Sequence, residues 1–196
     1  MCIRDSSGNR EYIPCDCLVL AIGHSARDTF YMLKDKLTME QKAFAVGLRI
    51  EHRQELINIH EFGDGKYKNY MPASYKLTHK ASNGRGVYSF CMCPGGYVVN
   101  ASSEDGMLAV NGMSYSKRDS ENANSALIVT VDNRDFGSED VLAGIEFQRR
   151  LEKKAYELGG GRVPVQRFGD FRENRTTTES ALSSNTVKPC IKGGYT

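Results

Sequence analysis

A pair of cysteines followed by a rigid turn is the strongest candidate for chemistry in this sequence. Cys91 and Cys93 are separated by one residue, so on a strand both side chains would point to the same face. Pro94, Gly95 and Gly96 follow directly and predict a tight turn. The backbone of such a turn could approach a flat ligand closely, because glycine has no Cβ. The two thiols could serve as redox groups, as metal ligands or as small buried side chains.

A second cysteine pair, Cys15 and Cys17, has the same spacing. Zinc ligands are usually separated by two or more residues, so neither pair fits the common zinc spacing well. Burial without chemistry is the simplest role for these thiols, and we predict it for Cys15 and Cys17. We therefore predict no metal site, and a four-thiolate site built from both pairs stays an alternative.

Near the start of the chain, an apolar run leads into a glycine turn. Residues 17–22 have the length and composition of a strand that is buried on both faces, as in a parallel sheet. Gly23, His24 and Ser25 form the turn, and the apolar spacing predicts a helix over 29–37. A glycine at the strand end and the positive start of a helix suit a dinucleotide phosphate, although any strand–helix junction has the same pattern. The sequence contains neither a Gly-x-Gly-x-x-Gly nor a Walker loop, so a main pyrophosphate loop would lie outside this chain.

A third candidate region combines Asn111, Gly112 and Met113 with a polar stretch, residues 118–125, that contains Asn122. This stretch stands next to a strongly apolar run. Polar loops at strand ends are common places for binding groups. A solvated loop whose side chains cap turns would have the same composition.

Around these candidates, the sequence predicts a sheet of short strands and one long helix. Turn residues separate the apolar runs, which is typical of an antiparallel or mixed sheet. The expected strands are 43–50, 75–77, 87–93, 97–101, 107–111 and 125–131. The expected helices are 52–62 and 139–158. Ser138 is the expected N-cap of the second helix, in which Glu146 and Arg150 are spaced to form an ion pair.

The composition excludes several classes of protein. The 196 residues are 40% hydrophobic and 26% charged, with a formal net charge of +2, which is typical of a globular chain. No apolar stretch approaches the roughly 18 residues of a spanning helix, and no basic run marks a nucleic-acid surface. We therefore predict neither a membrane nor a nucleic-acid partner. The six cysteines without a secretory signal predict a cytoplasmic protein with reduced thiols.

Three segments together resemble a family of uncharacterised bacterial FAD-dependent dehydrogenases, the NAD(P)/FAD-dependent oxidoreductases of unknown substrate. These segments are residues 18–28, 86–96 and 111–127, and the run from Cys91 to Gly96 is the most specific part. Shorter matches occur at 144–150 and 157–161. The resemblance covers roughly residues 8–172.

The resemblance implies a flavin-dependent oxidoreductase that binds FAD, with NAD(P)H as a candidate electron donor and an unknown small-molecule substrate. Cys91 and Cys93 are the implied catalytic residues. A strand ending in Ala-x-Gly, here Ala21 to Gly23, would touch the flavin nucleotide. The implied cofactor-binding residues are Ala21, Gly23, His24, Ser25, Arg27, Pro94, Gly95, Gly96, Asn111, Gly112, Met113 and Asn122.

The implied fold is α/β plus α+β: the end of a Rossmann-like FAD-binding domain (7–37), followed by a substrate domain (38–172) with a mainly antiparallel or mixed sheet and one long helix. Residues 1–6 are expected to be a non-native leader, and 173–196 a Ser/Thr-rich loop with a truncated end. Members of this family are longer, so we expect this fragment to lack parts of its own protein at both ends and to be inactive alone. Two alternatives stay open: a non-catalytic flavin or nucleotide-binding redox module, and a cysteine-based metal-binding α+β protein.

Overall fold

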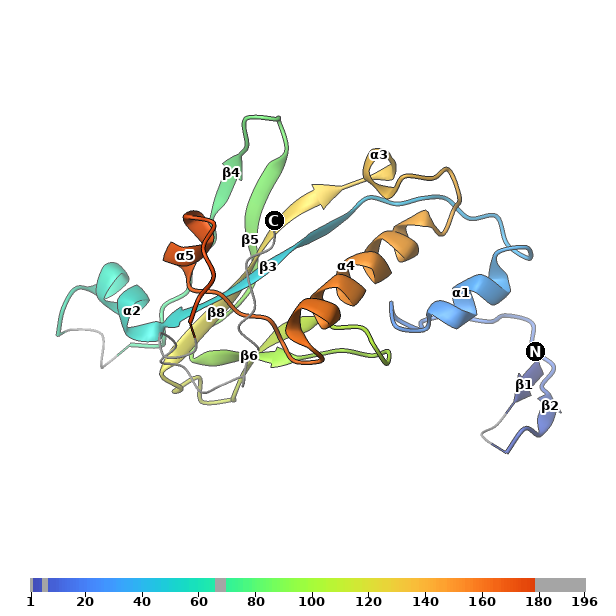
Figure 1. Ribbon diagram of the computed structural model, residues 1–196. Coiled ribbons are helices and arrows are strands. Elements are labelled where there is room, and N and C mark those ends of the chain that lie inside the picture. Colours follow the sequence, from blue (N-terminus) through green and yellow to red (C-terminus); the bar gives the residue numbers. More distant parts are fainter. Residues whose placement is uncertain (1, 5–6, 66–69, 179–196) are drawn as a thin grey trace.

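The computed structural model describes residues 2–4, 7–65 and 70–178 (Figure 1). Its centre is a four-stranded sheet in the order β3 (Phe44–Arg53), β8 (Asn122–Val131), β5 (Gly86–Cys93) and β4 (Thr78–Lys80). Two hairpins accompany it: β1 (Cys2–Arg4) with β2 (Arg10–Tyr12), and β6 (Gly96–Asn100) with β7 (Val110–Ser114). The helices are α1 (Arg27–Leu33), α2 (Gln54–Phe62), α3 (Asn133–Phe136), α4 (Ala143–Gly159) and α5 (Phe168–Arg172).

All strand pairs in the described residues are antiparallel, so this part of the chain has an α+β fold. The predicted antiparallel sheet and long helix are confirmed, although several boundaries differ. The expected strands 75–77 and 107–111 are replaced by β4 and β7, which begin three residues later. None of the helices among the described residues has the length and apolar character needed to cross a membrane.

The long pair of β3 and β8 fixes which side chains share a face of the sheet. Its register runs without a break from Phe44 opposite Val131 to Arg53 opposite Asn122. Residues directly opposite each other in an antiparallel pair point to the same face. Phe44 and Val46 therefore share one face with Val131, whereas Arg49 lies on the other face.

The apolar core lies at one end of this strand pair. Val131, Phe136 and Ala143 are buried there, with Phe44 and Phe147 packed against them. The Phe44 and Phe136 rings stack with their centroids 5.2 Å apart, and Phe147 meets Phe44 edge-on at 6.2 Å. This aromatic cluster attaches α3 and the first half of α4 to the sheet, so the opposite end of β3 and β8 is left to polar contacts.

The connection between α3 and α4 shows why the long helix begins later than predicted. Gly137 ends α3 in the left-handed conformation, and the Ser138 hydroxyl accepts from the backbone of Asp140 instead of capping a helix. Asp140 in turn accepts from Leu142, so α4 begins only at Ala143. Residues 139–142, which were expected to form the first turn of the helix, therefore belong to this connection instead.

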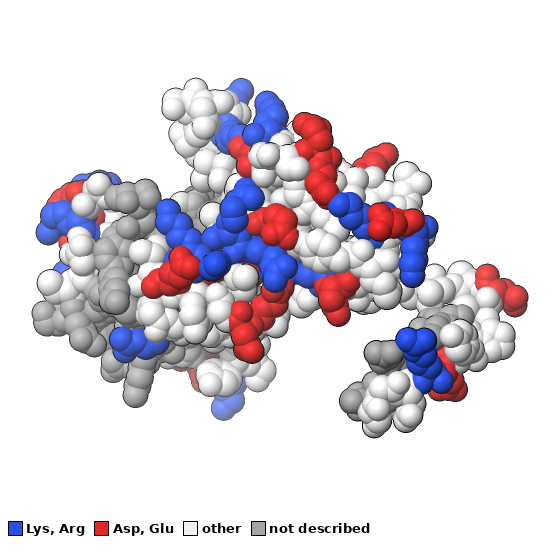
Figure 2. Space-filling view, turned by 45° about the vertical axis from the view of Figure 1, so that its right-hand side comes forward, with Lys and Arg blue, Asp and Glu red and all other residues white. Residues whose placement is uncertain are grey.

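The predicted ion pair within α4 is also absent. Arg150 donates to the carbonyl of Phe136 at 3.1 Å, and Glu146 accepts from the hydroxyl of Tyr31 on α1. Figure 2 shows that basic and acidic side chains lie next to one another across the visible face. Arg149 and Glu104 form one ion pair of the molecule, with 3.0 Å between Nη2 and Oε2.

Residues 17–22 do not form a strand, so the prediction of a buried strand at this position is wrong. The run has no strand partner among the described residues, and Val19 is 82% exposed. A strand needs a neighbour for its backbone N–H and C=O groups, and an apolar run alone does not supply one. No Rossmann unit is therefore seen in the described part of the chain. Residues 2–4, which we excluded from the fold, pair with β2.

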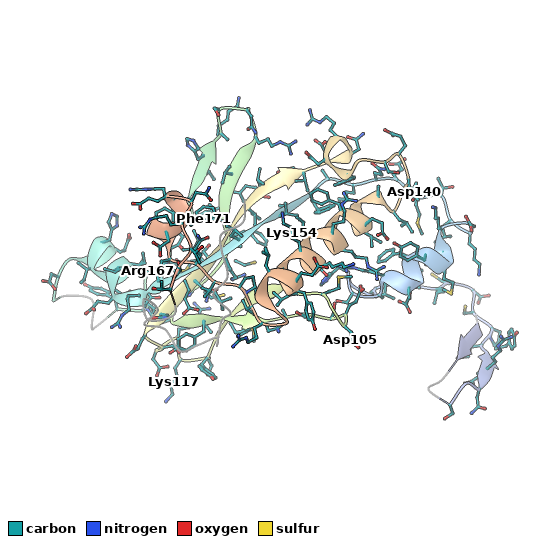
Figure 3. The ribbon with its side chains drawn as sticks, viewed as in Figure 1. Asp105, Lys117, Asp140, Lys154, Arg167 and Phe171 are labelled. Atoms are coloured by element: carbon teal, nitrogen blue, oxygen red, sulfur yellow. The ribbon has the colours of Figure 1, made fainter. Side chains whose placement is uncertain are left out.

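Arg27 attaches α1 to the rest of the molecule. Its side chain is almost completely buried and contacts Glu152 at 2.6 Å and Glu104 at 2.9 Å. The hydrogen bond to Glu152 is the main reason why the pKa of the Arg27 guanidinium is raised, although burial opposes it. Glu104 belongs to the β6–β7 connection, which also carries Asp105 in Figure 3, and Leu108 of this connection donates to the backbone of Glu152 at 3.1 Å. Arg27 thus joins three separate segments.

The capping box of α3 gives a testable prediction about pH. Asp132 accepts from the side chain and the backbone of Arg134, and these bonds lower the pKa of Asp132 to about 2. A carboxylate with a lowered folded-state pKa stabilises the protein above its ordinary pKa and loses this effect as the pH falls through the folded value. We expect Asp132→Asn, which keeps the capping oxygen, to lower the melting temperature at neutral pH and to weaken its decline between about pH 4 and pH 2.

Thermal denaturation followed by circular dichroism measures both effects. Glu139→Gln removes the same charge from a carboxylate that forms no ion pair within the described residues. If the melting temperature of Asp132→Asn falls with acid as steeply as that of the unchanged chain, the Asp132 carboxylate does not stabilise the fold.

Candidate functional site

Arg49 of β3 is the centre of a polar cluster that joins three other strands. Its Nε donates to the Oδ1 of Asn124 on β8 at 2.8 Å, and its Nη1 donates to the Oδ1 of Asn111 on β7 at 3.0 Å. Its Nη2 donates to the carbonyl of Cys91 at 2.6 Å and lies 3.4 Å from the Sγ of Cys93, both on β5. We call these five residues the Arg49 cluster.

The charge of Arg49 is not balanced by a carboxylate in its cluster. All four partners are neutral acceptors, and Arg49 forms no ion pair within the part of the chain that the structure describes. Its side chain is half-buried. A cation that is held in place by neutral groups keeps its charge available to an anion.

A β-bulge gives the two cysteines of the cluster different environments. The register between β5 and β8 shifts between Phe90 and Cys93, and Cys91 has a φ of 45°, which is unusual for a residue other than glycine. Cys91 is exposed, whereas Cys93 is half-buried. The expectation of strict alternation therefore fails, because the extra residue of a bulge interrupts the two-residue period of a strand.

The other sulfur atoms also correct a prediction. Cys15 and Cys17 are exposed and not buried. Their segment has no strand partner, so no layer of the fold covers them. Among the described residues, no group of three or more His, Cys, Asp or Glu side chains lies close enough to hold a metal ion.

Gly112 of β7 allows the second hairpin to lie directly on the cluster. A Cβ at this position would be 2.0 Å from the Oδ1 of Asn124 and 2.3 Å from the Nη2 of Arg49. Both distances are far below a normal contact. Only the missing side chain of glycine lets the β7 backbone come this close.

Glu51, two residues after Arg49 on the same face of β3, continues the polar contacts. Its carboxylate accepts from the Nδ2 of Asn122 and from the backbone N–H of Val98 on β6, each at 2.7 Å. Glu51 therefore fixes the first strand of the hairpin in the same way that Arg49 fixes the second.

The Pro-Gly-Gly turn is buried in protein. The N–H of Gly95 donates to the Oε1 of Gln54 at 2.8 Å, and the hydroxyl of Ser114 donates to the carbonyl of Pro94 at 2.7 Å. A Cβ on Gly95 would be 1.9 Å from the carbonyl oxygen of Arg118. In this structure the turn holds the cysteines in place, and the close approach that its glycines permit is to other parts of the chain.

The structure brings together only part of the predicted site. Cys91, Cys93, Asn111 and Gly112 meet at Arg49, and Asn122 joins them through Glu51. Ala21, Gly23, His24 and Ser25 lie exposed in the segment before α1, and no hydrogen bond connects them to the Arg49 cluster in the described residues. The side chain of Met113 is 60% exposed. The Arg27 side chain forms ion pairs with Glu104 and Glu152, so it does not face the Arg49 cluster.

Sequence reasoning missed the residues that organise the site, namely Arg49, Glu51, Gln54 and Asn124. A signal for two of them was available. Arg49 is the charged residue of the otherwise apolar predicted strand 43–50, and Glu51 follows this strand directly. If the strand continues by one residue, the two side chains share one face. Asn124 lay in the candidate stretch 118–125 but was not singled out, because its contact with Arg49 joins distant segments. Gln54 gave no signal.

A second polar group lies close to the cluster. The Nε2 of His52 is 2.9 Å from the hydroxyl of Tyr75, which is also hydrogen-bonded to Ser125. Burial raises the pKa of Tyr75, although the bond to Ser125 and the charge of Arg49 act in the opposite direction.

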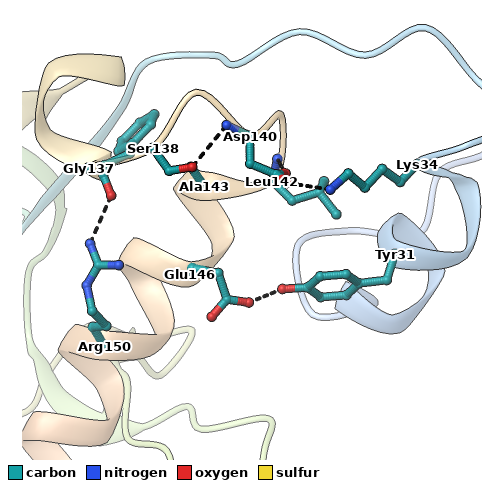
Figure 4. A pocket seen from close by; sticks show the side chains of 10 residues that line it. Tyr31, Lys34, Gly137, Ser138, Asp140, Leu142, Ala143, Glu146 and Arg150 are labelled. Carbon is teal, nitrogen blue, oxygen red and sulfur yellow. Dashed lines mark hydrogen bonds and ion pairs between the residues drawn. The ribbon is translucent and has the colours of Figure 1, made fainter.

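A hollow of about 410 Å³ between α1 and α4 is a weaker candidate for a binding site (Figure 4). Its charged side chains pair with one another: Lys34 with Asp140, and the Tyr31 hydroxyl with Glu146, which raises the pKa of Tyr31. None of the site residues predicted from the sequence lines it. The hollow therefore offers a ligand few uncommitted polar groups.

The fold and the cluster define an α+β domain that carries a fixed cation beside two thiols. Residues 43–195 match the family model described as FAD-dependent protein, C-terminal domain-like, and the chain belongs to this family. A relative, an uncharacterized protein of Clostridium beijerinckii, is 53% identical over 192 residues, which are 95% of this chain. The chain spans 35% of the length of that relative.

The close packing at Gly112 gives a second prediction. Because a new Cβ would overlap Asn124 and Arg49, we expect Gly112→Ala to lower the free energy of unfolding by about 1–3 kcal/mol, the usual cost of overpacking. Gly86→Ala is the matched control. It also adds a methyl group to a glycine on a strand, but there the Cβ would meet no atom within 4 Å.

Urea denaturation of the two variants separates the outcomes. The control should change the free energy of unfolding by less than about 0.5 kcal/mol. Equal stability of both variants would mean that the hairpin does not lie directly on the Arg49 cluster.

Proposed function

We propose that this chain is part of a cytoplasmic FAD-dependent oxidoreductase and that the Arg49 cluster borders its redox site. The observation that carries the proposal is the convergence of Cys91, Cys93, Asn111 and Gly112, from separate segments of the chain, on one unbalanced cation. Membership of a family of FAD-dependent proteins supports FAD as the cofactor.

The residues present fit the polar edge of a flavin ring. That edge carries carbonyl and ring-nitrogen acceptors, and Arg49 and the exposed Asn111 offer N–H donors at the surface of the cluster. The FAD, when bound, would supply the electron or hydride transfer, and the protein would position and tune it. Arg49 would bind and orient the ring through its charge, and Asn111 would keep the guanidinium in place.

Three further roles belong to this proposal. NAD(P)H is the proposed electron donor, and a small molecule is the proposed substrate. We propose Ala21, Gly23, His24 and Ser25 as contacts to the nucleotide part of FAD, because this exposed segment has no other partner that would fix it among the described residues. The thiols of Cys91 and Cys93 would face the substrate.

A non-catalytic flavin-binding module is the second candidate, since the same cluster could bind a flavin without turnover. Nothing in the described part of the chain favours the metal-binding alternative, because the two cysteine pairs do not form a common group there. Reduction of a bound flavin by NADH or NADPH separates the first two candidates.

Visible absorption spectra test the proposal. The full-length Clostridium beijerinckii relative and this chain should be purified, mixed with FAD and freed of unbound cofactor by gel filtration. We expect a bound-flavin spectrum for the relative that bleaches on addition of NADH or NADPH. A flavin that stays oxidised would favour the non-catalytic module, and a relative that neither contains nor takes up FAD would contradict the proposal.

The role of Arg49 has its own variant pair. In this chain, or at the matching position of the relative, Arg49→Gln should weaken FAD binding at least about tenfold, the usual effect of losing a charge-assisted contact. Arg53→Gln removes the same charge from an exposed residue of the same strand and should have little effect. Equal FAD affinity for both variants would place the flavin elsewhere.

A further inference from the structure

The environment of Cys93 differs from that of an ordinary half-buried thiol in two independent ways. The first is the guanidinium of Arg49, whose Nη2 lies 3.4 Å from the sulfur and which has no carboxylate partner among the described residues. The second is Asn124. This residue is fully buried and lies directly opposite Cys93 in the register of β5 and β8, and its Nδ2 has no hydrogen-bond partner.

An unpaired N–H that is completely buried is costly, so its position indicates where an acceptor belongs. Residues opposite each other in a β-ladder point to the same face, so the amide of Asn124 and the side chain of Cys93 are neighbours. A neutral thiol is a weak acceptor, whereas a negatively charged sulfur is a strong one. Such a sulfur would have a cation on one side and a buried amide on the neighbouring strand.

The other contact of the Cys93 sulfur is a hydrogen bond that would be lost together with the thiol proton. As a thiol it donates to the carbonyl of Cys91 at 3.4 Å. This carbonyl already accepts from the Nη2 of Arg49 at 2.6 Å. Loss of the thiol proton would therefore leave no unsatisfied acceptor behind.

We infer that Cys93 is the nucleophilic thiol of this site, that Arg49 is the positioning residue whose guanidinium faces its sulfur, and that the site takes an organic disulfide. Cys91 is more exposed, but it offers its carbonyl and not its sulfur to the guanidinium. The inference concerns the chain itself and stands whether or not FAD binds to it.

The reaction with a disulfide is balanced without a further reactant. The Cys93 thiolate attacks one sulfur of the disulfide, a new S–S bond forms, and the original S–S bond breaks. The second sulfur leaves as a thiolate, and the proton that Cys93 gave up goes to solvent. Cys91 is two residues away and exposed, so its thiol can then attack the mixed disulfide, release the second half of the ligand as a thiol and leave a bond between the two cysteines.

The test compares the two thiols within one native protein. The chain is treated with a limiting amount of iodoacetamide, an uncharged probe whose iodide leaves as the S–C bond forms, and fragment-ion mass spectrometry measures the alkylation at each cysteine. We expect Cys93 to react about tenfold faster than Cys91 despite its lower exposure, because reactivity follows thiolate character. In urea, where the Arg49 contact is lost, the two rates should become similar.

Variants then identify the cause of the preference. Arg49→Gln should abolish it, and Arg49→Lys, which keeps the charge but not the planar fork, should retain part of it. Arg53→Gln, the matched loss of charge on the same strand, should leave it unchanged. Circular dichroism checks that each variant is folded. If Arg49→Gln does not fold, the ratio of the Cys93 and Cys91 alkylation rates in Arg49→Lys is compared with that of the unchanged chain instead.

The disulfide itself is tested with 5,5′-dithiobis(2-nitrobenzoate), which releases a coloured thiolate on exchange. In a chain whose other four cysteines are replaced by serine, we expect rapid release with Cys91→Ser and slow release with Cys93→Ser. Faster reaction of Cys91 in the native chain, or a preference that survives Arg49→Gln in a folded variant, would overturn the inference. An equal rate of exchange for the two serine variants would do the same.

Discussion

The guanidinium of Arg49 reaches from β3 to three other strands, and the arrangement of the candidate site depends on this set of hydrogen bonds. The aromatic core around Phe136 holds only one end of the β3–β8 pair. At the other end, the β6–β7 hairpin and the bulge of β5 are attached through polar groups. The carbonyl of Cys91 points to Arg49 because the bulge gives Cys91 a positive φ, and the hairpin can approach because Gly112 has no side chain. The strained backbone of Cys91 and the close packing at Gly112 are therefore both found next to the Arg49 guanidinium.

A comparison with Arg27 shows why Arg49 is a functional candidate. Both side chains connect segments that are distant in the sequence. Arg27 is almost fully buried and is surrounded by the carboxylates of Glu104 and Glu152, so its charge is used within the fold. Arg49 is more exposed and has only neutral acceptors. Because a cation without a counter-charge attracts an anion, Arg49 is the better candidate of the two for binding a charged ligand.

The chain belongs to a family of FAD-dependent proteins and spans about a third of the Clostridium beijerinckii relative. The exposed apolar segment before α1 and the exposed face of the Arg49 cluster are therefore best understood as parts of a larger assembly of elements. In the proposed function, FAD would contact both regions. The proposed reactivity of Cys93 would give such an enzyme a second redox group beside its cofactor.

The sequence by itself determined the antiparallel sheet and the long helix, because these follow from local periodicity. It also predicted Cys91, Cys93, Asn111 and Gly112 as site residues, from residue types with few roles. It also suggested a strand at residues 17–22, which failed because a strand depends on a neighbour that local sequence cannot specify. The tertiary structure alone decided that Arg49 and Asn124 organise the site. Both acquire their roles from the register of β3, β5 and β8 and from the bulge at Cys91. Hydrogen bonds between residues 42 to 75 positions apart leave no periodic pattern in the sequence.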